Sequence, residues 1–296
     1  MSEVGVRVPR VYLADRERNV ALVEDVRGGK LEDDMNPAAL RRLGVMLREM
    51  WGHGSPRLGK VAYCGAADGA AQAAAREAAA REAAAREVAA REVAAGAREA
   101  AAGVGPARAA IGKESLGAAR AAVGEELARE RPAGEEPARE RPAGEEIVLR
   151  RALRDLGDAA GRVGRIGAVR GRLDERVREL ADRVGERRDY RLIHGELGPD
   201  HVLLDEQGEP VIIDIEGLMY FDLEWEHVFL RLRFGDRYRY LETQGLDEHR
   251  MRFYALAMHL SLVAGPLRLL DGDFPEREGM VEIVRYNTDR VLEGLA

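Results

Sequence analysis

The sequence predicts an α+β fold in which a helix-rich second half carries a few short strands. Apolar residues recur at helical spacing over long stretches near both ends of the chain. Short apolar runs bounded by Gly, Pro and Asp occur close to the N-terminus and again after residue 190. Between these two parts lies a long low-complexity segment without an apolar stripe. We therefore expect a folded protein interrupted by one unusual insert.

Composition narrows the class of protein. The chain has 296 residues, of which 46% are hydrophobic, enough for one large domain or two modest ones. Its formal net charge of −7 argues against a general nucleic-acid binder, because phosphate contacts need a basic surface. Cys64 is the single cysteine, so we expect no intrachain disulfide and no Cys-rich metal site.

Neither a targeting signal nor a membrane span is expected. The N-terminal residues MSEVGVRVPR lack the apolar core of a signal peptide. The most apolar late stretch, residues 256–270, contains His259 and Arg268 and looks too short and too polar to cross a bilayer. We therefore expect a cytoplasmic protein that has no membrane partner.

The N-terminal part is predicted to hold a strand pair and then a helix. Residues 11–13 and 21–26 are apolar runs on either side of the polar turn 15–19, which predicts two short strands. Pro37 then opens a helix whose apolar residues recur at helical spacing, with Asn36 as its N-cap.

A long insert is predicted at residues 69–146. The unit REAAA recurs there with a period of five, and the ten-residue unit GEELARERPA then recurs with Pro in place of Leu. A period of five does not match the turn of a helix, about 3.6 residues, so no apolar face forms. Glu and Arg four residues apart support an isolated helix and Pro breaks it, so we expect a helical spacer and then disorder. A protein-binding arm is the alternative for this insert.

Regular structure is predicted again from residue 147. Residues 147–184 carry apolar positions at helical spacing, which predicts one or two helices. Residues 190–193, 202–204 and 211–215 are short apolar runs separated by turn residues, which predicts three strands. From residue 224 the pattern is mostly helical.

Chemistry-bearing residues gather in the stretch RLIHGELGPDHVLLDEQGEPVIIDIEG, residues 191–217. Acidic and imidazole groups stand there at the ends of apolar strands, where a rigid scaffold holds polar groups in place. Asp214 follows an apolar run, so we expect its carboxylate at the end of a buried strand. Because an unpaired buried carboxylate is costly, a metal ion, a ligand or a hydrogen-bonding partner is implied for Asp214.

This stretch resembles the catalytic loop and metal strand of aminoglycoside phosphotransferases, choline kinases and related small-molecule kinases of the protein-kinase-like fold. The loop pattern H-G-D-x-x-x-x-N reads here as HGE at residues 194–196 and His201. The metal strand reads IDIE at residues 213–216, and FDLEWE at residues 221–226 resembles the family's G-D-P-x-x-D element. Residues 8–11 and 22–26 resemble the last small-lobe strands and the hinge.

The resemblance implies a role for each matching residue. Glu196 is expected to accept the proton of the substrate hydroxyl, and His194 to brace the loop. Asp214 is expected to hold the Mg²⁺ that bridges the ATP phosphates, with His201 and Glu216 as further metal ligands. The hinge backbone is expected to contact the adenine through Val23, Glu24, Asp25 and Val26.

The same resemblance divides the chain. It implies a small-lobe remnant with the hinge at residues 1–27, the start of the large lobe at 28–68, the insert at 69–146 and the remaining large lobe at 147–296. Few residues precede the hinge strands, and Lys occurs only at positions 30, 60 and 113. We therefore expect a truncated small lobe that lacks the glycine-rich phosphate loop and the strand Lys.

Two residues depart from the family pattern. Glu196 keeps the acid but reaches one methylene farther, and His201 replaces an amide by an imidazole, which suits softer metals than Mg²⁺. The leading prediction is phosphotransfer from ATP, with Mg²⁺, to a hydroxyl of a small molecule. One alternative is a catalytically inactive kinase-like module that binds a nucleotide or a protein. The other is a metal-dependent hydrolase that uses the imidazole and acidic groups of His194, Glu196, His201 and Asp214.

Overall fold

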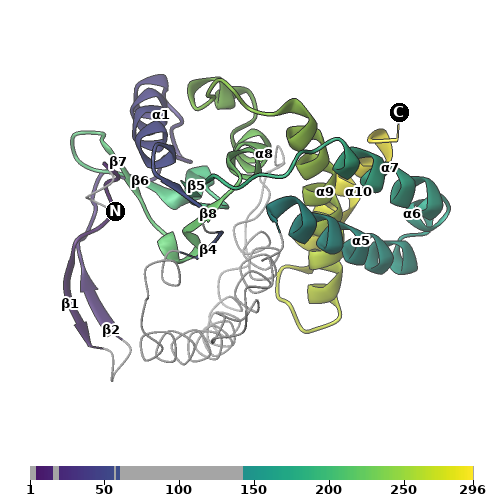
Figure 1. The fold of residues 1–296 in the computed structure, drawn as a ribbon. Coiled ribbons are helices and arrows are strands. Elements are labelled where there is room, and N and C mark those ends of the chain that lie inside the picture. The colour runs from purple at the N-terminus through teal and green to yellow at the C-terminus, as the bar shows by residue number, and fades with distance from the viewer. Residues whose placement is uncertain (1–4, 16–19, 57, 61–142, 296) are drawn as a thin grey trace.

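The computed structural model describes residues 5–15, 20–56, 58–60 and 143–295 (Figure 1). All but the last four residues of the predicted insert lie outside these ranges. The described part is rich in helices and contains one four-stranded and two two-stranded sheets, which confirms the α+β prediction.

The first two strands form an antiparallel hairpin that stands away from the helices (Figure 1). Strand β1 (Val11–Asp15) pairs with β2 (Val20–Val23), as predicted. β2 ends three residues earlier than predicted, so the segment after Val23 is extended chain leading out of the hairpin. Its first residue stays attached, because the Glu24 N–H donates to the Arg10 carbonyl at 2.8 Å.

Helix α1 (Pro37–Trp51) follows the sequence prediction closely. Asn36 caps it, since its Oδ1 accepts the N–H of Ala39 at 2.9 Å. The apolar face predicted from the spacing is buried, with Leu40, Leu43 and Leu47 fully inaccessible to solvent. This face packs on strand β5 (Tyr190–Ile193).

A small central sheet combines distant parts of the chain. Its strand order is β3 (Gly54–Ser55), β5, β8 (Met219–Phe221) and β4 (Gly59–Lys60), and every neighbouring pair is antiparallel. The sequence prediction contained only β5. The two-residue strands β3 and β4 begin at a glycine and carry no apolar run, and β8 was missed although its three residues are apolar. Ile193 pairs with Met219, so the chain leaving β5 lies beside the chain entering β8.

The third sheet is the hairpin of β6 (Val202–Leu204) and β7 (Pro210–Ile212). The segment after the first hairpin joins it, since the Gly28 N–H donates to the Leu204 carbonyl at 2.8 Å. β7 was predicted to continue to residue 215, but it stops at Ile212 and the chain turns into the short helix η4 (Ile215–Gly217). Asp214 therefore lies in a turn and not at the last strand position.

Helices form the rest of the molecule (Figure 1). α9 (Glu248–Leu270) is central and contacts α5 (Gly144–Arg162), α7 (Arg170–Asp182), α8 (Leu223–Phe234) and α10 (Arg277–Glu293). The shorter elements are α6 (Gly164–Gly167), η3 (Pro199–His201) and η5 (Gly235–Tyr240). α5 begins at Gly144, three residues before position 147, where regular structure was expected to resume.

Helix α9 is long and apolar enough to cross a membrane by length and composition. It has 23 residues because it begins at Glu248, well before the stretch 256–270, so the argument that this segment is too short was wrong. However, 67% of its most apolar window is buried inside the molecule. Its apolar character is that of a core helix.

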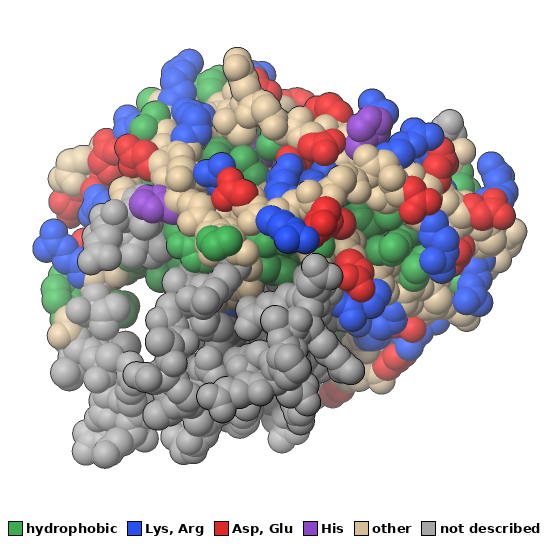
Figure 2. Space-filling model, in the orientation of Figure 1, with side chains coloured by type: hydrophobic (Ala, Val, Ile, Leu, Met, Phe, Trp, Pro, Cys, Tyr) green, Lys and Arg blue, Asp and Glu red, His purple; other side chains and the backbone are tan. Residues whose placement is uncertain are grey.

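Charged side chains of both signs alternate over the face shown in Figure 2. Many Arg residues pair locally with acids, as in Arg162–Asp271, Arg165–Asp289 and Arg178–Asp174, each at 2.7 Å. Such exposed pairs contribute little to stability, because water and salt screen them.

Candidate active site

The loop after β5 begins with a fully buried imidazole. His194 is 0% exposed, and its Nε2 lies 3.2 Å from the Ile213 carbonyl oxygen. Gly195 follows with a φ of +89°, and a Cβ there would lie 2.7 Å from the Cε of Met219. The backbone conformation therefore favours glycine at this position, whereas the end of the flexible Met219 side chain could move to admit a Cβ.

The acid Glu226 anchors this loop from helix α8. Its fully buried carboxylate accepts the backbone N–H of His194 at 3.3 Å and that of Gly195 at 2.7 Å. Burial raises the pKa of Glu226 to about 7, although the two N–H donors lower it. The sequence analysis did not identify this role. Its one signal was the match of FDLEWE to a family element.

His201 ends the loop and stands between a carbonyl and two acids. Its Nδ1 lies 3.1 Å from the Glu196 carbonyl oxygen. Its Nε2 lies 3.4 Å from the Oδ2 of Asp214 and 3.6 Å from the Oδ2 of Asp200. The ring stacks on that of His194, with the centroids 5.7 Å apart. Both imidazoles are thereby fixed in orientation.

Asp214 adopts a left-handed backbone conformation, with a φ of 63° and a ψ of 43°. Across the part of the chain that the structure covers, it is the only non-glycine residue with a positive φ. Asp tolerates this region better than most residue types. The turn brings its carboxylate toward His201 while the side chain stays 21% exposed. The Asp214 carboxylate is therefore partly exposed to solvent.

Asp200, another acid of this loop, forms an ion pair with an arginine. Asp200 pairs with Arg233 of α8, and both side chains are almost fully buried. Burial would raise the pKa of Asp200, but the charge of Arg233, followed by that of His201, outweighs it and lowers the pKa. Asp200 is thus a stable anion close to His201, which the sequence analysis had not singled out.

The two remaining predicted acids border the helix η4. Glu196 is half-buried, and a Cβ added at Gly217 would lie 3.0 Å from its Oε1. The carboxylate of Glu196 therefore lies against the turn that follows Asp214. The backbone of Glu216 belongs to η4, and its side chain is not among the described parts of the structure. The structure thus brings His194, Glu196, His201 and Asp214 to one corner of the molecule.

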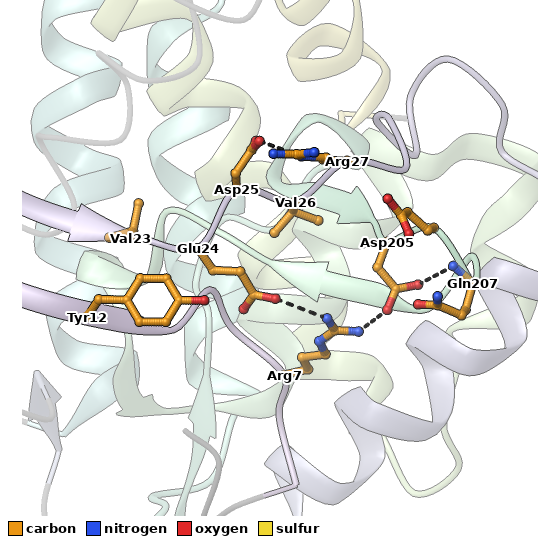
Figure 3. Close-up of a pocket in the computed structure, with 10 residues that line it drawn as sticks. Arg7, Tyr12, Val23, Glu24, Asp25, Val26, Arg27, Asp205 and Gln207 are labelled. Carbon is orange, nitrogen blue, oxygen red and sulfur yellow. Dashed lines mark hydrogen bonds and ion pairs between the residues drawn. The ribbon is translucent and has the colours of Figure 1, made fainter.

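The predicted adenine contacts line a cavity of about 550 Å³ (Figure 3). Residues 23–26 form one wall, and Arg7 with residues 205–207 contributes to the rest. Arg7 bridges the walls through ion pairs with Glu24 at 3.4 Å and with Asp205. Four carboxylates and two guanidinium groups line the cavity, so it favours a neutral or cationic group over a phosphate.

Buried ion pairs hold the start of α8 in place. Arg250 of α9 donates to the Oδ2 of Asp222 at 2.6 Å, and Arg187 donates to the Oε1 of Glu224 at 3.0 Å. Asp222 occupies the N-cap position of α8, but its side chain makes no capping hydrogen bond. Burial raises the pKa of Asp222 despite the charge of Arg250. This network fixes the helix that presents Glu226 to the loop.

Of the comparisons with known proteins, only the one with solved structures bears on the fold. No protein-family model matches the chain, and no curated protein matches its sequence. The structure is similar to a thermostable mutant of aminoglycoside phosphotransferase APH(4)-Ia, with a TM-score of 0.52, 13% identity, and coverage of 98% of this chain and 78% of that one.

Two further solved structures resemble this chain. A thermostable mutant of APH(4)-Ia in a ternary complex with ADP and hygromycin B has a TM-score of 0.53 at 13% identity, covering 98% of this chain and 77% of that one. Choline kinase LicA from Streptococcus pneumoniae has a TM-score of 0.47 at 12% identity, covering 99% of this chain and 76% of that one. The likeness to APH(4)-Ia shows a protein-kinase-like fold, as the sequence predicted.

Proposed function

We propose that this chain is a phosphotransferase that moves the γ-phosphoryl group of ATP to a hydroxyl of a small molecule. The observation that carries this proposal is the meeting of Asp214 with the loop 194–201, where the Oδ2 of Asp214 lies 3.4 Å from the Nε2 of His201. In kinases, catalysis consists mainly of positioning and charge stabilisation. A rigid corner of acidic and imidazole groups is suited to that task.

Support for a nucleotide comes from the fold. The similar structure of APH(4)-Ia was solved with ADP and hygromycin B, which are a nucleotide and a small molecule. In this chain, we place the adenine at the hinge residues 23–26, which line the 550 Å³ cavity. The phosphates extend away from that cavity toward Asp214, because the acids that line it repel them.

Glu196 is the proposed general base. Its carboxylate lies beside the Gly217 turn and takes the proton of the acceptor hydroxyl as the phosphoryl group is transferred. His194 and Gly195 hold the loop through the Ile213 carbonyl and the Glu226 carboxylate. The fixed loop keeps the position of Glu196 constant, which matters because misplacement by about 1 Å costs roughly a hundredfold in rate.

A divalent cation suits part of this corner. The carboxylate of Asp214 is a hard oxygen donor that would hold such an ion, which supplies charge neutralisation to the transferred group when bound. The neighbouring donor, however, is the imidazole nitrogen of His201 and not an oxygen. This donor set fits a divalent cation in general but departs from the all-oxygen preference of Mg²⁺.

A transfer assay tests the proposal. The full chain is incubated with γ-labelled ATP, Mg²⁺ or Mn²⁺, and a panel of hydroxyl-bearing small molecules including aminocyclitols and amino alcohols. We expect labelled product from at least one acceptor class, and a rate at least roughly a hundredfold lower in Glu196→Gln. The variant Glu282→Gln, which changes an exposed acid of α10 outside the proposed site, is the matched control and keeps the rate.

Two results would count against this account. Transfer that is unchanged in Glu196→Gln would remove Glu196 as the base. ATP binding without transfer to any acceptor would favour the inactive nucleotide-binding module instead.

A further inference from the structure

Three guanidinium groups gather around the phenol of Tyr240, where the short helix η5 ends against helix α1. The Cζ of Arg239 lies over the Tyr240 ring, 5.0 Å from its centroid, and the Cζ of Arg41 lies 5.2 Å from the same centroid. Arg237 is near enough to act on the phenol through its charge. We call these four residues the Tyr240 cluster.

Close contact between two distant segments of the chain builds the Tyr240 cluster. Three of its members belong to η5, and Arg41 comes from α1. A Cβ added at Gly44 of α1 would lie 2.4 Å from the backbone carbonyl oxygen of Tyr240, so the two backbones touch at this glycine. Arg41 precedes Gly44 by three residues and therefore projects from the same face of the helix. The arrangement thus follows from how α1 packs on η5.

The positive charge of the Tyr240 cluster is not neutralised by ion pairs. Arg42, the next residue along α1, pairs with Glu209 at 3.2 Å. Within the ranges that the structure describes, no carboxylate forms such a pair with the three cluster arginines, and Asp236 acts on Arg239 through its charge alone. Stacking on an aromatic ring orients a guanidinium group but leaves its charge and its N–H donors available.

The phenol oxygen lies in the positive potential of these groups. The Nη2 of Arg239 donates to the Oη of Tyr240 at 3.3 Å. This hydrogen bond, together with the charges of Arg239, Arg41 and Arg237, lowers the pKa of the Tyr240 phenol below its usual range. A potential that stabilises a phenolate also stabilises another anion placed beside the phenol. Contacts and electrostatics therefore both point to an anion at this position.

A phosphate group fits the Tyr240 cluster better than other common anions. Guanidinium groups bind phosphate oxygens through paired N–H donors, and a neutral phenol adds an O–H donor. Three cations and one neighbouring acid, Asp236, leave an excess of positive charge that matches one dianion. A nucleic acid would extend beyond these few residues onto a protein whose net charge is −7.

We propose that Arg41, Arg237, Arg239 and Tyr240 form a binding site for a single phosphate dianion, either inorganic phosphate or the monoester of a small molecule. The Tyr240 cluster shares no residue with the corner formed by the loop 194–201 and Asp214. Binding there requires neither ATP nor a metal ion. The proposal therefore stands or falls independently of the proposed phosphotransferase function.

The first test is calorimetric titration of the full chain with sodium phosphate and, separately, with glycerol 3-phosphate. It is done at about pH 8, where a phosphate monoester is a dianion, with NaCl holding the ionic strength constant. The variants are Arg41→Gln and Arg239→Gln, whose exposed side chains can be replaced without disturbing the core. The control is Arg285→Gln, which removes an exposed arginine of α10. Circular dichroism confirms that each variant is folded.

The second test observes the phenol directly. Tyrosine labelled with ¹³C at Cζ is followed by nuclear magnetic resonance during an alkaline titration, with and without phosphate. The spectrum of Tyr240→Phe identifies the signal of Tyr240. Because a bound dianion disfavours the phenolate, phosphate should raise the pKa of Tyr240. Sodium chloride at equal ionic strength should raise it less.

We expect saturable binding of at least one of the two phosphate compounds. Each cluster variant should weaken it roughly threefold or more, and Arg285→Gln should leave it unchanged. Tighter binding of glycerol 3-phosphate would identify a monoester as the ligand, and tighter binding of inorganic phosphate the free ion. The proposal is overturned if neither compound binds more tightly than chloride. Binding that survives unchanged in both Arg41→Gln and Arg239→Gln also overturns it, because the phosphate would then lie elsewhere, as does a Tyr240 titration that ignores phosphate.

Discussion

The carboxylate of Glu226 in helix α8 accepts the backbone N–H of Gly195 at 2.7 Å across 31 residues of sequence. This contact fixes the loop that presents Glu196 and His201. It is fully buried, so no water replaces the acceptor when it is lost.

We predict that Glu226→Ala lowers the free energy of unfolding by about 1–3 kcal/mol, because two buried N–H groups lose their acceptor. Denaturant unfolding at pH 5 measures this change. Glu278→Ala is the control, since Glu278 is an exposed acid in the first turn of α10. Equal stability of Glu226→Ala and the unmodified protein would contradict the anchoring role.

Stability should depend on pH through the same residue. Burial raises the pKa of Glu226 to about 7, whereas an unfolded Glu titrates near 4.5. Between these values the folded state holds more protons at this residue, so the contribution of Glu226 to stability is greatest below pH 4.5 and falls as the pH rises to about 7. The contribution lost is roughly 3 kcal/mol. We predict that Glu226→Gln removes this part of the pH dependence of unfolding, and identical pH profiles would refute the assignment.

Removing one partner of the ion pair between Asp222 and Arg250 should be strongly destabilising. The two side chains are 0% and 2% exposed, and Nη1 lies 2.6 Å from Oδ2. We predict that Arg250→Met alone costs about 3–5 kcal/mol, because it leaves the Asp222 charge buried without its main partner. The double variant Arg250→Met with Asp222→Leu should cost less than the single one. Thermal unfolding compares them, and a double variant that is less stable than Arg250→Met would contradict this reasoning.

Two glycines make a matched pair. Gly195 has a φ of +89°, which side chains rarely adopt, whereas Gly157 lies inside α5 with nothing within 4 Å of an added Cβ. We predict that Gly195→Ala destabilises the protein by more than about 1 kcal/mol, and that Gly157→Ala stabilises it by about 0.5–1 kcal/mol. Chemical denaturation measures both, and equal effects of the two substitutions would show that the loop backbone is not constrained as described.

The sequence predicted correctly those elements that are defined by residues close together in the chain. The start of α1 at Pro37 and its cap at Asn36 needed only helical spacing and turn chemistry, and both were confirmed. Strands β3 and β4 were missed because each has only two residues, one of them glycine, and exists through pairing with a distant partner; β8 was missed although Met219–Phe221 is an apolar run. Periodicity carries no information about such short segments.

The candidate site was likewise predicted only in part. The sequence order of His194, Glu196, His201 and Asp214 predicted that these residues belong together, and the structure places them at one corner. The contact of Glu226 with the loop and the pairing of Asp200 with Arg233 were not predicted, since both join helix α8 to a loop more than 25 residues earlier. The left-handed turn at Asp214 was also missed, because apolar residues continue past the end of β7.

The most direct test of the central claim is calorimetric titration of ATP into the full chain, with Mg²⁺ and Mn²⁺ in separate runs. We predict micromolar to low-millimolar binding with at least one of the two ions. Asp214→Ala should weaken this binding at least tenfold, whereas Asp273→Ala, which changes an exposed loop acid, should not. ATP binding that is absent with both ions, or that is indifferent to Asp214→Ala, would contradict the assignment of this corner as a phosphotransferase site.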